Sequence, residues 1–290
     1  MRFPFYLFVA FALVQCWNAD ECVAQKRPSV VAQADVHVQA CGPCAIVNSM
    51  RYASGSFARK VARLDQQPNE TLARTLIATL GSRKSSTYEN KPSFNPESGV
   101  SCGDLTRMYQ DFITDSLSKG PSEFELSGTY LDRDENETCP EHLRRVHEIF
   151  HDSLEQGFPP VLSIRTFATK KDPTQGKFLW HGLAGHFVTV TKVQPEIREN
   201  EKGFSFEFAD PDTAKREFGY FHFNESRNFT AAKGNREKWT WIKDRPFLLI
   251  TAPSVKMQTH YAAHHERTII TANYVIAPKS LFELPKNHLR

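Results

Sequence analysis

The chain has 290 residues, of which 40% are hydrophobic and 24% charged, a composition typical of a folded globular protein and not of a disordered one. Its net charge is only +3 and it contains no long run of Lys or Arg. We therefore expect no nucleic-acid partner.

The first residues predict export. Met-Arg precedes FPFYLFVAFALVQCW, residues 3–17, which carry no charge, and small residues follow in Cys22-Val23-Ala24. This is the pattern of a secretory signal peptide, and the apolar stretch is too short for a comfortable membrane span. We predict a signal peptide over 1–24, no stable membrane span after its cleavage, and a secreted or periplasmic location in preference to lipoprotein anchoring.

The next part of the chain has the periodicity of helices. Apolar residues recur at helical spacing from Cys44 to about Leu80, over 104–117, and over 141–157, where Gly157 marks a helix end. Residues 81–101 are rich in Ser, Lys, Asn, Pro and Gly, which predicts a long loop.

After Pro159-Pro160 the pattern changes to strands. Short β-branched and aromatic runs such as VLSIRTF, HFVTVTKV and FSFEFAD are separated by turn residues. Helices first and strands second predict an α+β protein. We expect one domain over 25–290, with a helical lobe over about 36–157 and an antiparallel β-sheet lobe over about 158–290.

The segment QACGPCAIVNSM, residues 39–50, contains the strongest chemical signal. Cys41 precedes a Gly-Pro turn that opens a helix, and a helix N-terminus favours the thiolate that a nucleophile needs. Cys44, one turn later, is the alternative nucleophile. The same two cysteines could instead form a surface disulfide or a redox pair. A thioredoxin-like fold, however, alternates strands and helices, and this chain separates them.

A thiol nucleophile needs an imidazole partner, and His186 lies in the strand pattern GHFVTV, 145 residues after Cys41. If HFVTVTKV and FSFEFAD pair about Arg198, His186 lies opposite Asp210, with the two Cβ atoms about 4.5 to 5.5 Å apart. The carboxylate would then accept the Nδ1–H of the imidazole and fix its tautomer. Cys41, His186 and Asp210 are the candidate catalytic residues.

These residues stand in short motifs that resemble, in the same order, those of the papain-like bacteriocin-processing peptidases, the double-glycine leader peptidase group, and their secreted relatives. The motifs are Cys41-Gly42-Pro43 with Ala45-Ile46, Gly185-His186-Phe187-Val188, and Ala209-Asp210-Pro211, with Gly99-Val100 ahead of Asp104-Leu105 as a similar helix-opening segment. The resemblance implies a papain-like cysteine peptidase fold, a Cys41, His186 and Asp210 triad, and a peptide or protein substrate.

The resemblance also implies a Gln about six residues before the nucleophile, whose side chain stabilises the oxyanion of the transition state. That position is Asp35 here, so Gln33 and Gln39 are the candidate substitutes. If Cys44 is the nucleophile, Gln39 lies five residues before it.

Two further groups of residues are candidates for structural or metal-binding roles. Cys102 and Cys139 are the candidate structural disulfide of an exported protein. His260, His264 and His265 have spacing that suits a metal, but they lack an evident acidic or Cys partner. We expect neither a metal nor another cofactor.

The sequence thus predicts an exported papain-like cysteine hydrolase that cleaves peptide bonds. Two alternatives stay open. One is an acyl or γ-glutamyl transferase of the phytochelatin-synthase type, which carries a similar Cys-Gly start and Gly-His-Phe. The other is a non-hydrolytic dithiol redox or binding module.

Overall fold

The computed structural model of the chain describes residues 28–64, 67–117, 124–171, 178–223, 247–255 and 268–282. The predicted signal peptide over 1–24 and the three histidines within 260–265 lie outside the described residues.

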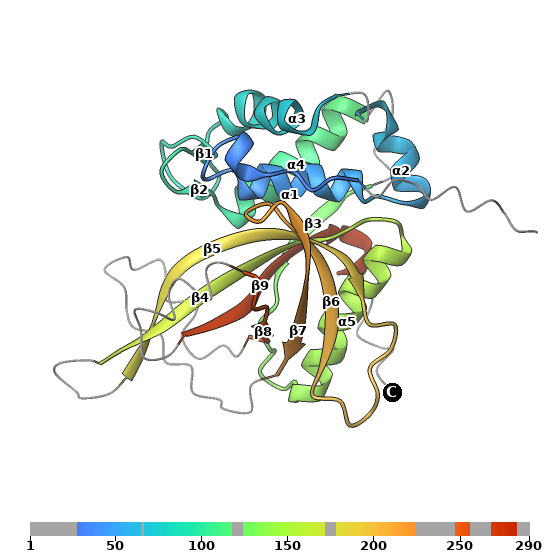
Figure 1. Cartoon of the computed structure of the whole chain (residues 1–290), viewed down its shortest axis with the longest axis vertical. Helices are drawn as coiled ribbons and strands as arrows, with labels where there is room; N and C mark the ends of the chain where they lie inside the picture. The colour runs from blue at the N-terminus through green and yellow to red at the C-terminus, as the bar shows by residue number, and fades with distance from the viewer. Residues whose placement is uncertain are drawn as a thin grey trace, which may run out of the picture.

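The helices of the first half form a layer above the strands (Figure 1). They are α1 (Cys41–Arg51), α2 (Gly55–Val61), α3 (Asn69–Leu76) and α4 (Cys102–Leu117), with 3-10 turns η1 (Gln33–Asp35) and η2 (Ala62–Leu64) and a π-helical turn η3 (Ile77–Gly81). The helical patterns predicted for this part of the chain are confirmed. Apolar side chains such as Ile46, Leu76 and Tyr109 are fully buried in the core of this layer.

The predicted loop over 81–101 contains a small hairpin of β1 (Phe94–Asn95) and β2 (Gly99–Val100). The buried carboxylate of Asp104, in the first turn of α4, holds this segment in place. It accepts hydrogen bonds from the Ser85 hydroxyl at 2.6 Å, the Ser86 amide at 2.7 Å and the Ser101 hydroxyl at 2.7 Å. Burial alone would raise the pKa of Asp104, but these hydrogen bonds lower it below its usual value.

The strands form one antiparallel sheet that closes on itself. They are β3 (Leu126–Tyr130), β4 (Val161–Lys171), β5 (Phe178–Val193), β6 (Gly203–Asp210), β7 (Lys215–His222), β8 (Leu249–Thr251) and β9 (Thr268–Pro278). Their order is β3-β9-β4-β5-β6-β7-β8, and β8 also pairs with β9. The six strands β9-β4-β5-β6-β7-β8 therefore make a closed barrel, while β3 pairs with the remaining length of β9.

The predicted papain-like fold, a helical lobe beside an antiparallel sheet lobe, is wrong, because the strands close into a six-stranded barrel. Closure depends on β8, which is three residues long, pairing Leu249 with Thr271 and Ile250 with Ile270. Strand propensity identifies a run of residues as a strand, but it does not say that the last strands return to pair with each other.

Helix α5 (Cys139–Glu155) packs on the barrel and not within the helical layer (Figure 1). Its Phe150 stacks on Phe221 of β7 with ring centroids 5.4 Å apart. A capping box between Thr138 and Glu141 opens the helix. Gly157, predicted to end α5, has a positive φ of 78°. Its carbonyl accepts a hydrogen bond from the Ser54 amide at 3.0 Å, which ties the end of α5 to the start of α2. A 3-10 turn, η5 (Lys279–Leu281), follows β9.

We predict that Gly157→Ala destabilises the protein more than Gly55→Ala. Both glycines have positive φ, which costs an Ala residue about 1 to 2 kcal/mol. Only at Gly157 would a Cβ also collide with backbone, 2.3 Å from the carbonyl oxygen of Ser54, whereas nothing lies within 4 Å at Gly55. Urea unfolding should show an extra loss of at least about 1 kcal/mol for Gly157→Ala; equal losses would contradict this account.

Candidate functional site

Cys41 is the first residue of α1, at the end where the helix presents N–H groups without intrahelical partners. The N-cap residue Ala40 provides no side-chain hydrogen bond to these groups. The next residue, Gly42, is buried, and a Cβ at this position would lie 2.6 Å from Val100 and 3.0 Å from Leu105. The glycine therefore lets the start of α1 approach β2 and α4, and the half-buried Cys41 thiol is left facing a pocket.

His186 of β5 and Asp210, the last residue of β6, form a buried pair. The imidazole Nε2 lies 2.7 Å from Oδ1 of the carboxylate, and the two side chains are only 6% and 1% exposed. The Asp212 amide donates a second hydrogen bond to the same oxygen at 2.8 Å. Burial lowers the pKa of His186, but hydrogen bonds to Asp210 and to the Cys41 thiol outweigh it and raise the pKa to about 10.

The structure thus brings the three predicted residues together, but not through the predicted strand register. Thr189 pairs with Ala209 and Val190 with Phe208, so Asp210 is not directly opposite His186. The hairpin turns about a later point than Arg198, because Val193 pairs with Phe206 and Lys192 with Glu207, and the bulge between Val190 and Lys192 shifts the register back by one residue only. The side chains still meet because diagonal neighbours on one face of a sheet are within reach of long side chains.

The predicted hydrogen bond also uses the other ring nitrogen. We expected the carboxylate to accept the Nδ1–H of His186, whereas Nε2 faces Asp210. Because Asp210 occupies Nε2, Nδ1 is the ring nitrogen left to serve the Cys41 thiol, which lines the same pocket. The imidazole therefore stands between sulfur and carboxylate, which is the arrangement needed to move a proton at the thiol.

A pocket of about 130 Å³ lies over this group. It is lined by Gln33, Val38, Gln39, Cys41, Gly185, His186, Asp210, Asp212 and Val255. Both predicted oxyanion candidates are therefore at the pocket, whereas Asp35, at the position where the resemblance places the Gln, is exposed.

Gln33 is the better held of the two glutamines. Its Nε2 donates to Oδ1 of Asp212 at 3.2 Å, and its backbone N–H donates to the carbonyl of Pro211 at 2.8 Å. Its Oε1 is buried and meets no hydrogen-bond donor among the described residues. These bonds tie η1 to the residues after β6, so Gln33 and the Asp210 carboxylate are positioned by the same turn.

Cys44, the alternative nucleophile, is fully buried in the core of the helical layer and does not line the pocket. Burial raises the pKa of the Cys44 thiol well above its usual range. A thiol that stays protonated is a poor nucleophile, so the structure favours Cys41 over Cys44 for this role.

The predicted disulfide between Cys102 and Cys139 is not formed; the described part of the chain contains no disulfide bond. Cys102 begins α4, and burial raises its pKa to about 11. Cys139 begins α5, where its sulfur accepts a hydrogen bond from Arg133 at 2.8 Å.

Sequence reasoning missed Asp212, which lines the pocket and contacts both Gln33 and Asp210. Its signal in the sequence is weak. It follows Asp210 by two residues, but Pro211 interrupts the strand, so the alternation of a strand does not extend to it. Only the fold of the turn shows that it returns to the site.

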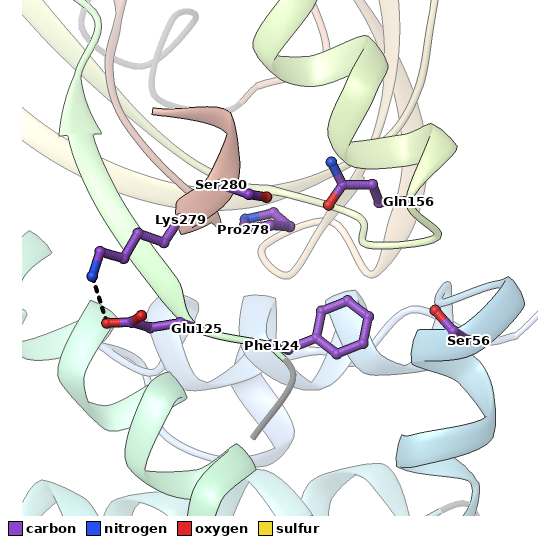
Figure 2. A pocket seen from close by; sticks show the side chains of 7 residues that line it. All are labelled: Ser56, Phe124, Glu125, Gln156, Pro278, Lys279 and Ser280. Atoms are coloured by element: carbon purple, nitrogen blue, oxygen red, sulfur yellow. Dashed lines mark hydrogen bonds and ion pairs between the residues drawn. The ribbon is translucent and has the colours of Figure 1, made fainter. Parts of the chain in front are cut away.

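A larger pocket, of about 480 Å³, lies elsewhere, between α2, the end of α5 and the start of η5 (Figure 2). It is lined by Ser56, Phe124, Glu125, Gln156, Pro278, Lys279 and Ser280. The Glu125 carboxylate pairs with the Lys279 ammonium across 2.8 Å. Its lining contains neither a thiol nor an imidazole to activate a hydroxyl, so the smaller pocket at Cys41 is the candidate active site despite its size.

Among the residues that the structure describes, no group of three or more His, Cys, Asp or Glu side chains is arranged to hold a metal ion. Within the same residues, no helix combines the length and hydropathy needed to cross a membrane. In comparisons with known proteins, no family model, no curated protein and no solved structure matches this chain.

We predict that Asp210→Asn lowers the pKa of His186, because a neutral amide stabilises the imidazolium less than a carboxylate does. Histidine NMR should show His186 protonated through neutral pH in the wild type, with titration near pH 10, and titration at lower pH in the variant. His142 is the internal control: burial lowers its pKa to about 4, and the change should leave it unaffected. A His186 that titrates near pH 6.5 in the wild type would contradict the assignment.

Proposed function

We propose that the protein is an exported cysteine hydrolase that cleaves peptide bonds. The observation that carries the proposal is the pocket that joins the Cys41 thiol, at the start of α1, to the buried His186–Asp210 pair. A nucleophile beside an imidazole that is oriented by a third group is the geometry of covalent acyl-transfer catalysis. Export is proposed from the apolar segment at the start of the chain.

At the start of the first half of the reaction, the Cys41 thiolate faces the His186 imidazolium, which holds the proton of the thiol. The sulfur forms a bond to the carbonyl carbon of the substrate, and the carbonyl π electrons move to oxygen. The backbone N–H of Cys41 and the side-chain N–H of Gln33 stabilise this oxyanion. His186 then gives its proton to the leaving amine as the C–N bond breaks.

In the second half, water attacks the thioester and His186 accepts a proton from it, which it returns to the sulfur when the acid leaves. Asp210 stays ionised and stabilises the imidazolium in both steps. The raised pKa of His186 supports this role, because it keeps the ring protonated while the sulfur carries the negative charge.

We predict that iodoacetamide labels Cys41 faster than the other described cysteines, because Cys41 lines the pocket beside the His186 imidazolium. His186→Ala should slow this labelling, and Cys44 and Cys102 should stay unlabelled, because burial raises the pKa of both thiols. Mass spectrometry of the protein under mild reduction locates the label. Preferential labelling of Cys44 would overturn the assignment.

Hydrolysis should require Cys41 and not Cys44. On a screen of quenched fluorescent peptides, Cys41→Ala should lower kcat by at least about 10⁴-fold, as loss of a nucleophile does. Cys44→Ala, one helical turn away, is the matched control and should keep most of the activity. A redox function instead predicts that both changes abolish reduction of insulin disulfides. A transferase predicts glutathione adducts among the products, and either result would refute hydrolysis as the main reaction.

We predict that Gln33→Ala lowers kcat by about 10²- to 10³-fold with little change in KM, because the oxyanion loses a donor only in the transition state. Asp212→Ala should reproduce part of this loss, since it releases the Gln33 amide, whereas Asp212→Asn keeps an acceptor at 3.2 Å and should restore activity. Labelling of Cys41 should not change in these variants. Gln39→Ala is the control, and a larger loss there than at Gln33 would transfer the role to Gln39.

A further inference from the structure

His37 lies between the two groups proposed to stabilise the oxyanion, the side chain of Gln33 and the backbone N–H of Cys41. It follows η1, which begins at Gln33, and precedes α1, which begins at Cys41. Its backbone N–H donates a hydrogen bond to the carbonyl of Gln33 at 2.8 Å, and its own carbonyl accepts one from the Ala40 N–H at 2.8 Å. The main chain of His37 thus links η1 to the residue before Cys41.

The His37 side chain adds a third link. Its Nδ1 accepts a hydrogen bond from the backbone N–H of Gln39 at 3.1 Å. A side-chain acceptor that binds the backbone two residues later closes a tight turn, as the side chains of Asn and Asp do. The His37 ring packs edge-on against Phe94 of β1, with centroids 5.6 Å apart. This contact limits rotation of the ring and keeps Nδ1 directed at the Gln39 amide.

Apolar burial does not hold the centre of this turn, because the Val38 side chain is 68% exposed. The hairpin of β1 and β2 packs closely against the residue that follows. A Cβ at Gly99 of β2 would lie 3.2 Å from the carbonyl oxygen of Gln39, and Gly99 has a positive φ of 75°. The turn is therefore held by the hydrogen bonds of His37 and by contact with the hairpin.

The separation of the two oxyanion donors depends on this turn. The bonds from Gln33 to Pro211 and Asp212 fix Gln33 relative to the barrel. The Cys41 N–H belongs to α1, in the helical layer, and the chain between the two donors runs through the His37 turn. An oxyanion site stabilises the transition state only when its donors are held at the correct positions before the reaction begins.

We propose that His37 is a positioning residue of the candidate oxyanion site: the bond from the Gln39 N–H to Nδ1 of His37 sets the turn that fixes Gln33 relative to Cys41. His37 is not among the described residues that line the pocket, so it acts through its neighbours and not on substrate. The inference rests on the proposed hydrolase function, for which it names a further residue.

Two substitutions separate the acceptor from the ring. His37→Asn keeps an acceptor, because the Asn side chain can accept from the N–H two residues later. His37→Phe keeps an aromatic ring against Phe94 and removes the acceptor. On a quenched fluorescent peptide that the wild type cleaves, His37→Phe should lower kcat by about tenfold or more with little change in KM, because displaced donors are missed mainly in the transition state. His37→Asn should keep most of the wild-type kcat.

His151→Phe, the same change at a half-buried histidine of α5, is the matched control and should leave kcat unchanged. Labelling of Cys41 by iodoacetamide should proceed at the wild-type rate in His37→Phe, because alkylation of the sulfur forms no oxyanion. Equal losses of labelling rate and kcat would overturn the proposal, since the damage would then lie at the thiol. So would a wild-type kcat in His37→Phe, or equal losses of kcat in His37→Asn and His37→Phe.

If His37→Phe does not fold, hydrogen exchange of the Gln39 amide in the wild type decides. Protection of this amide supports the bond to Nδ1, and exchange at the rate of an unprotected amide overturns it.

Failure of the positioning role and failure of the hydrolase are distinguishable. If cleavage depends on Cys41 but not on the acceptor of His37, only the positioning role is wrong. If Cys41→Ala leaves cleavage intact, the hydrolase function itself is wrong.

Discussion

The candidate site depends on the packing of α1 against β5. The Thr189 hydroxyl donates a hydrogen bond to the carbonyl of Ala45 at 2.7 Å, and both residues are fully buried. Phe187 of β5 is buried in the same core as the side chains of α1. Cys41 lies one turn before Ala45 in the helix, and His186 lies just before Phe187 in the strand. A rigid contact between the two elements therefore sets the separation of thiol and imidazole, as catalysis by oriented groups requires.

Desolvation explains why the rest of the site is built around one turn. Burial of a carboxylate or an imidazolium without a partner costs roughly several kcal/mol of desolvation free energy, so each of these ions needs a close partner. The Asp210 carboxylate is hydrogen-bonded to the His186 imidazole and to the backbone N–H of Asp212. The carbonyl of the neighbouring Pro211 accepts a hydrogen bond from the backbone N–H of Gln33. The turn after β6 thus satisfies the buried acid and fixes η1 at the same time. A disturbance of this turn should affect both.

Position within one helix separates the two cysteines of the CGPC segment. Cys41 opens α1 at the pocket, whereas Cys44 points into the core of the helical layer, where burial raises its pKa. The sheet places the other two residues: β5 carries His186, and the neighbouring β6 ends at Asp210, whose carboxylate meets the imidazole.

The sequence by itself determined the helices and the strand runs, and it singled out Cys41, His186 and Asp210 as candidates, because periodicity and the chemistry of a thiol at a helix start are local properties. Only the tertiary structure decided how these parts meet. The position of the turn between β5 and β6 set the register, and the short β8 closed the barrel in place of the expected sheet lobe. The choice of Nε2 toward Asp210 and the recruitment of Asp212 followed from that geometry. Pairing between distant strands depends on turns, bulges and burial across the whole fold, which no single segment encodes.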